Sequence, residues 1–208
     1  MRQRNPNSFA LVALDGVFKS RAHIKKVAQQ ATLIVAADGA YNKLKKIGIK
    51  PHVVVGDFDT LGFIPIDCKV QKYSRKKNKT DGELAIEYAL SKKVKKIVIA
   101  GFYGGREDHM LGHYALLQKF STQCQFEVLG KLSHLHTVSK SEFEIRARPG
   151  STISIVCLDS QGAVVSTQGL KYEASKLKLF PGGRGLSNEI VGKFAIITVH
   201  KGIVFVLF

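Results

Sequence analysis

The chain is poor in acidic residues, in cysteine and in long apolar runs. It has 16 Asp and Glu against 32 Lys and Arg, and its net charge of +16 attracts anions such as nucleotide phosphates, nucleic acid or an acidic membrane surface. Cys68, Cys124 and Cys157 are widely spaced and form no metal-type pair, which favours reduced thiols. The apolar run from Phe9 to Leu14 ends at Asp15, too short for a signal-peptide core, and no run is long enough to span a bilayer. We therefore expect a cytoplasmic protein without a membrane segment.

Hydrophobic residues make up 45% of the chain, enough for a folded core. The first part alternates short apolar runs with helical patterns, which predicts a mostly parallel sheet with helical crossovers. The predicted strands end in loops rich in Gly and Asp; they are 9–14, 32–37, 52–55 and 97–100. The predicted helices are 40–47, one beginning at Thr80 with Glu83 completing a capping box, and one from about Asp108 to Phe120.

After about residue 138 the pattern changes to short alternating strands separated by turns. Runs typical of strands occupy 151–158, 163–167, 194–199 and 203–208, and no helical stripe of useful length follows. This indicates an all-β second domain, a small sandwich. We therefore predict an α/β catalytic, nucleotide-binding domain at 1–136 and a β-sandwich domain at 137–208.

The positions of the scarce acids carry most of the functional signal. Each lies at the end of a predicted strand or the start of the next helix: Asp38, Asp57, Asp59, Asp81 and Asp108. In an open parallel sheet these positions line the edge where ligands bind. Each Asp alone is explained by a cap or a turn, but together they favour a site for Mg²⁺, which takes carboxylate oxygens, substrate phosphates and water.

Three further features border this predicted site. Gly104-Gly105-Arg106 precedes a helix start, a pattern that suits phosphate, although it also fits an ordinary loop. Thr80 caps its helix and can also present its backbone N–H to a phosphate. His109 and His113 have helical i,i+4 spacing but lack a third ligand, so we interpret them as one packed face of a helix.

An ordered set of short motifs resembles the thiamin pyrophosphokinase family. The motifs cover nearly the whole chain, and only their order makes them specific; they are AADGA (36–40), GDFDT (56–60), TDGELA (80–85), GFYGGREDHMLG (101–112), GLKY (169–172) and LSNE (186–189). The chain departs from the family pattern at Asn78, Lys79, His113, Gly130, Ser133 and Cys157, and it has no Trp.

The resemblance implies an α/β domain followed by a β-sandwich, and transfer of diphosphate from ATP to thiamin with release of AMP. It implies that Asp57, Asp59 and Asp81 hold Mg²⁺ on the ATP phosphates, and that Asp38 shapes the same acidic site. On the nucleotide side it implies contacts from Arg106 and Asp108, with Thr80 at the helix start. It also implies a homodimer whose thiamin site is completed by the partner's second domain, near Ser187 and Asn188.

Two other functions remain open at this point. HVVVGDFDT (52–60) also reads like the strand and Asp-x-Asp-x-Thr motif of a haloacid-dehalogenase-type phosphatase, in which Asp57 would be a covalent nucleophile. The net charge and the basic run from Arg75 to Lys79 suggest a non-catalytic nucleic-acid-binding protein. Acids gathered at one sheet edge would repel a phosphate backbone, so we expect no nucleic-acid partner.

Overall fold

The computed structural model describes residues 8–18, 20–76, 78–130 and 134–208 of the chain. These residues divide into two compact units: unit 1 takes those within Met1–Leu116 and Phe126–Leu132, and unit 2 those within Leu117–Gln125 and Ser133–Phe208. The domain boundary predicted between residues 136 and 137 falls inside strand β7 (His134–Ser139). Lys77 of the basic run, and Ser133 among the departures from the family pattern, lie outside the described residues.

Unit 1 is built on a mostly parallel sheet with the strand order β6-β5-β1-β2-β3-β4. β1 pairs in parallel with β2 and β5, β2 with β3, and β3 with β4. The prediction of a parallel α/β sheet is confirmed, although β4 is missed because its sequence, KVQK, has only one apolar residue. The strands are β1 (Phe9–Ala13), β2 (Leu33–Ala37), β3 (Val53–Gly56), β4 (Lys69–Lys72), β5 (Lys96–Ala100) and β6 (Gln125–Leu129).

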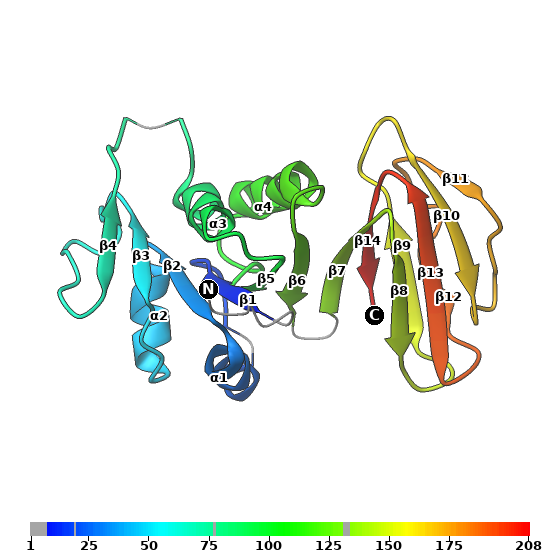
Figure 1. Ribbon diagram of the computed structural model, residues 1–208, viewed down its shortest axis with the longest axis horizontal. Helices are drawn as coiled ribbons and strands as arrows, with labels where there is room; N and C mark the ends of the chain where they lie inside the picture. Colours follow the sequence, from blue (N-terminus) through cyan, green and yellow to red (C-terminus); the bar gives the residue numbers. More distant parts are fainter. Residues whose placement is uncertain (1–7, 19, 77, 131–133) are drawn as a thin grey trace, which may run out of the picture. The chain divides into compact units, whose positions relative to one another are not determined.

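Helices cover both faces of this sheet, with α1 and α2 on one side and α3 and α4 on the other (Figure 1). α1 is not predicted because it is largely polar and buries only Ile24 and Val27. α3 begins where the capping box places it, since Thr80 Oγ1 accepts a hydrogen bond from Glu83 N at 3.2 Å. No helix of the described residues is long and apolar enough to cross a membrane. The helices are α1 (Arg21–Gln30), α2 (Ala40–Lys46), α3 (Asp81–Ser91) and α4 (Glu107–Phe120).

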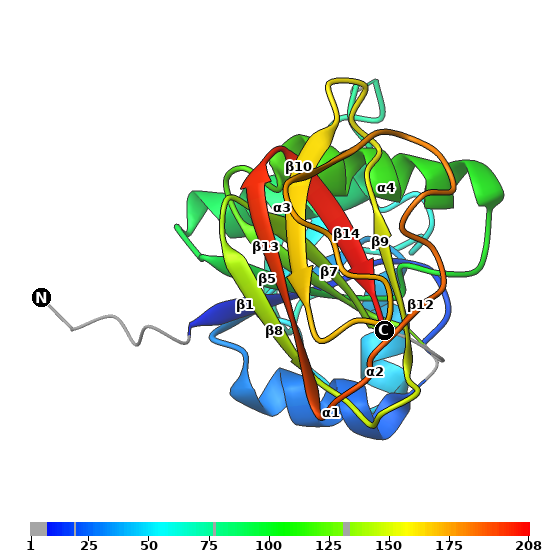
Figure 2. The same cartoon turned by 90° about the vertical axis from the view of Figure 1, so that its right-hand side faces the viewer.

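Unit 2 contains two antiparallel sheets, which confirms the prediction of an all-β second domain. One has the strand order β12-β9-β14-β7 and the other β11-β10-β13-β8, and β8, β13 and β10 run side by side in Figure 2. Apolar side chains from both sheets, including Ile155, Ile197 and Val204, form one buried cluster. The strands besides β7 are β8 (Glu142–Arg146), β9 (Thr152–Val156), β10 (Ala163–Gln168), β11 (Leu177–Leu179), β12 (Asn188–Glu189), β13 (Phe194–Lys201) and β14 (Ile203–Leu207).

Candidate active site

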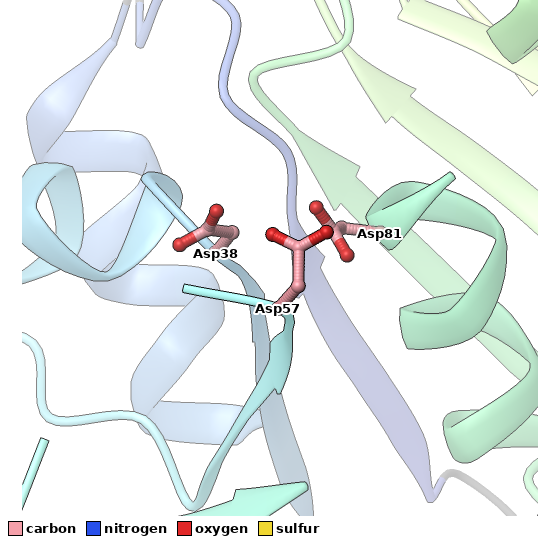
Figure 3. A group of neighbouring side chains, drawn as sticks. All are labelled: Asp38, Asp57 and Asp81. Carbon is pink, nitrogen blue, oxygen red and sulfur yellow. The ribbon is translucent and has the colours of Figure 1, made fainter. Parts of the chain in front are cut away.

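Three aspartates from separate parts of the sequence meet at the carboxyl edge of the unit 1 sheet. Asp38 follows β2, Asp57 follows β3, and Asp81 is the first residue of α3. The parallel pairing of β2 with β3 places the first two at the same edge. One carboxylate oxygen from each of the three residues lies within 4.8 Å of the others, and Figure 3 shows the side chains converging.

The last residue of β3 is glycine because the aspartates crowd around it. A Cβ atom at Gly56 would lie 3.0 Å from the Cβ of Asp38 and 3.2 Å from Oδ1 of Asp81. Any larger residue would therefore push these two side chains away from their present positions. The Gly56-Asp57 pair thus supplies one carboxylate and the space that the other two need.

Asp38 is the most buried of the three, with only 3% of its surface exposed. Its Oδ2 accepts a hydrogen bond from Thr60 N at 3.2 Å, whereas its buried Oδ1 has no hydrogen-bond partner in the described part of the chain. Burial raises the pKa of Asp38 above its ordinary value, the Thr60 bond opposes this, and the negative charge of Asp81 adds to it. Among the residues that the structure describes, Asp38 forms no ion pair with a lysine or arginine, and the group fits a hard divalent cation that accepts oxygen ligands.

Asp59, predicted as a metal ligand, is not part of this group. Its backbone N–H donates to Asp57 Oδ1 at 3.2 Å, and its own Oδ1 accepts from Thr60 Oγ1 at 3.2 Å. The backbone reverses between the two aspartates, where buried Phe58 has a left-handed φ of 66°. Of the three predicted ligands, the structure therefore brings Asp57 and Asp81 together, and it places Asp38, predicted to shape the same acidic site, beside them.

Arg106 and Asp108, predicted to contact the nucleotide, form an exposed pair at the start of α4. Arg106 Nη2 lies 2.5 Å from Asp108 Oδ2, and Nε donates to Oδ1 at 3.1 Å. The guanidinium, with His109 N as a further donor, lowers the pKa of Asp108 to about 2. Asp108 is therefore fully ionised near neutral pH, and the pair holds the Arg106 fork in a defined direction.

His113 faces an aromatic cluster, in keeping with the packed face predicted for it. Its Nδ1 lies 3.1 Å from Phe102 O, and because a carbonyl oxygen only accepts, Nδ1 carries the hydrogen. Burial lowers the pKa of His113, so the ring is neutral near pH 7. His109 and His113 belong to no group of metal-ligating side chains among the described residues.

Ser187 and Asn188 lie in unit 2, beside a cavity of about 240 Å³ that Tyr172, Leu186 and Asn188 help to line. The side chain of Asn188 makes two hydrogen bonds to the backbone of Tyr172: its Oδ1 accepts one from Tyr172 N at 3.1 Å, and its Nδ2 donates one to Tyr172 O at 2.8 Å. Ser187 has a left-handed φ of 56°, and its N–H donates to Ser154 Oγ at 3.1 Å. The two residues thus shape a loop that leaves Tyr172 68% exposed.

Asp15 and Lys43 contact each other beside Gly39, the residue that follows Asp38, and neither is predicted as a site residue. Asp15 lies two residues after the end of β1, whereas Asp38 directly follows β2, so a similar positional signal exists for Asp15, although the sequence pattern predicts it only as the end of a strand. Lys43 of α2 lies 2.8 Å from Asp15 Oδ1 through its Nζ atom. No sequence signal distinguishes Lys43 from the other lysines of that helix.

Comparisons with known proteins identify the family of the chain. A family model described as "Thiamin pyrophosphokinase, catalytic domain" matches residues 24–129, and one described as "Thiamin pyrophosphokinase, vitamin B1 binding domain" matches 136–204. The thiamine pyrophosphokinase of Bacillus subtilis (strain 168) is 27% identical over 185 residues, which are 85% of this chain and 86% of that protein.

Solved structures show the same fold. A crystal structure of the Bacillus subtilis thiamine pyrophosphokinase has a TM-score of 0.81 at 24% identity, covering 96% of this chain and 98% of the other. For the thiamin pyrophosphokinase of Candida albicans the TM-score is 0.76 at 16% identity, with 99% and 94% covered. The two family models together span both units of the chain. They favour this family over the phosphatase and over the nucleic-acid-binding protein. The chain belongs to the thiamin pyrophosphokinase family.

Proposed function

We propose that this protein transfers a diphosphate group from ATP to the hydroxyl group of thiamin, giving thiamin diphosphate and AMP, with Mg²⁺ held by aspartates of unit 1. One observation carries the proposal: carboxylate oxygens of Asp38, Asp57 and Asp81 lie within 4.8 Å of one another in a chain of net charge +16. Carboxylates held this close repel each other unless a cation intervenes. The match to the family's catalytic domain supports the same assignment.

In the proposed reaction the thiamin hydroxyl oxygen bonds to the β-phosphorus of ATP, the bond from that phosphorus to the α-phosphate oxygen breaks, and the hydroxyl proton is released. A Mg²⁺ ion bound at the aspartates would supply charge neutralisation for the phosphates. Asp38, Asp57 and Asp81 would hold the ion, with Asp59 as a further ligand on the evidence of the family motif. Arg106, directed by Asp108, and the N–H groups at the start of α3 after Thr80 would bind the nucleotide.

Unit 2 would bind thiamin, with Ser187 and Asn188 shaping the site and Tyr172 offering an exposed aromatic face in a chain that has no Trp. The match to the family's vitamin B1 binding domain supports this role. We further propose a homodimer in which the second domain of the partner completes each thiamin site. A cytoplasmic location fits the three cysteines, all of which are free thiols.

The direct test is an assay of purified protein with thiamin, ATP and Mg²⁺, followed for AMP and thiamin diphosphate. We expect both products in equal amounts, and a loss of turnover on the order of a hundredfold or more in Asp57→Asn and in Asp81→Asn. Glu144→Gln, which removes an exposed acid of β8 in unit 2, is the matched control and should retain wild-type turnover. Production of ADP in place of AMP, or full activity in both aspartate variants, would refute the proposal.

A further inference from the structure

We propose that Lys43 is a positioning residue of the acidic site: it anchors the loop after β1 and cancels the charge of Asp15, so that Asp38, Asp57 and Asp81 act as an isolated group of three carboxylates. The effect on the bound ion rests on the proposed function. The contacts between Lys43 and the loop after β1 lie within unit 1 and do not depend on the proposed function.

The side chain of Lys43 is fully engaged by the chain segment that follows β1. Its Nζ lies 2.8 Å from Asp15 Oδ1, donates to Gly16 O at 3.0 Å, and donates a short hydrogen bond to Asp15 O. Lys43 thus makes two hydrogen bonds to backbone carbonyl groups and one ion pair, all with the same loop. Lys43 is therefore a clamp between α2 and this loop.

The clamped loop also forms part of the carboxyl edge of the sheet. Gly16 N donates to Gly101 O at 2.9 Å, and Val17 N donates to Tyr103 O at 2.7 Å, so the loops after β1 and β5 are joined by their backbones. The approach is close, because a Cβ atom at Gly16 would lie 2.2 Å from Gly101 O. Lys43 thus connects α2 to this pair of joined loops.

Asp15 lies beside Gly39, the residue that follows Asp38, and is not part of the group of three carboxylates. A Cβ atom at Gly39, the residue after Asp38, would be 3.0 Å from Asp15 Oδ1 and 2.9 Å from Thr60 Cγ2. Asp15 is thus a further carboxylate close to the Asp38 backbone, but it is not a member of the group of three. Its charge would add to theirs if Lys43 did not offset it.

An ordinary exposed ion pair is the simpler interpretation, since the two side chains are 37% and 52% exposed, and such pairs contribute little to stability. The two interpretations differ in what happens to cation affinity. Lys43→Met leaves Asp15 uncompensated and should tighten divalent-cation binding, whereas Asp15→Asn leaves Lys43 uncompensated and should weaken it. By Coulomb's law, a unit charge about 8 Å from a divalent ion in surroundings close to water shifts the dissociation constant of the ion by about three- to tenfold. The two shifts should nearly cancel in the double variant.

The experiment measures Mn²⁺ binding to the full chain without nucleotide, by electron paramagnetic resonance, in the two single variants, the double variant and Lys43→Arg, which keeps the charge. Lys46→Met is the matched control, because Lys46 is an exposed lysine in the last turn of the same helix. Amide hydrogen exchange at Gly16 and Val17 is the second measurement. We expect opposite shifts in the single variants, wild-type affinity in the double variant, Lys43→Arg and Lys46→Met, and faster exchange only where Lys43 becomes Met.

The outcomes separate this inference from the proposed function. Mn²⁺ binding by the wild type with equal affinity in all variants would overturn the role of Lys43 and leave the proposed function intact. Weaker Mn²⁺ binding in both Lys43→Met and Asp15→Asn would also overturn this inference, because charge cancellation requires opposite shifts. A wild type that binds no Mn²⁺ without nucleotide would overturn this inference, whereas the proposed function would still be decided by the assay for AMP and thiamin diphosphate.

Discussion

At the scale of single residues, buried Asp38 lowers the stability of the folded protein when its carboxyl group is ionised. Its pKa is raised by burial, so the folded state holds the proton more tightly than the unfolded chain does. Stability is therefore lost as the pH rises from the ordinary Asp pKa through the raised value, and the whole penalty is present above it. A bound divalent cation would offset this penalty.

We predict that Asp38→Asn is more stable than the wild type at pH 7 without divalent ions, by on the order of 1 kcal/mol, while its turnover is lost. The amide removes the buried charge and can donate to the neighbouring carboxylates. Thermal unfolding in the presence of a chelator, measured from pH 3.5 to 7, should show the two proteins diverging as the pH rises. If the unfolding temperatures of the two proteins changed in parallel over that pH range, ionisation of Asp38 would not destabilise the folded state.

At the scale of secondary-structure elements, β3 requires glycine at its last position, whereas α4 does not require the glycine in its middle. At Gly56 a methyl group would meet Asp38 and Asp81, whereas at Gly112, in the middle of α4, it would meet nothing within 4 Å. Gly112 is helical and exposed, so alanine there removes backbone entropy from the unfolded chain without a clash.

We predict opposite effects for the two substitutions. Gly112→Ala should raise the free energy of unfolding by about 0.5–1 kcal/mol, measured by urea denaturation. Gly56→Ala should lower it and weaken Mn²⁺ binding, because two of the three carboxylates must move. Unchanged Mn²⁺ affinity in Gly56→Ala would mean that the carboxylates tolerate displacement and that their close approach is not needed to bind the ion.

At the scale of the molecule, the proposed catalytic and thiamin-binding residues belong to different units, Asp81 to unit 1 and Asn188 to unit 2. If the second domain of the partner completes each site, Asp81→Asn and Asn188→Ala damage different halves of it. A mixed dimer then has one site with both defects and one site with none.

We predict that each variant alone is nearly inactive, and that co-refolding the two in equal amounts restores about a quarter of wild-type activity, since half of the randomly formed dimers are mixed and each has one intact site. Sedimentation should show a dimer throughout. Co-refolding either variant with itself is the control. A dimer whose mixture stays inactive would place both halves of each site in one chain.

Local sequence was sufficient for the main elements and for the region of the site. Apolar runs of strand length, the Thr80 capping box and acids at strand ends predict the parallel sheet, α3 and the edge where the acids gather, because each of these signals acts over a few neighbouring residues. The alternating pattern after residue 138 predicts the second sheet domain for the same reason. Among the elements that the sequence does not predict, α1 and β4 are mostly polar and depend on packing against the sheet.

Which acids meet was decided by the tertiary structure. The spacing of GDFDT treats Asp57 and Asp59 alike, but the left-handed turn at Phe58 directs their side chains differently, and the pairing of β2 with β3 brings Asp38 beside Asp57. The Lys43–Asp15 clamp likewise joins residues from two elements that no sequence pattern relates. A sequence determines the edge at which a side chain emerges, whereas its contacts depend on backbone turns and strand register, which form only when distant segments pack together.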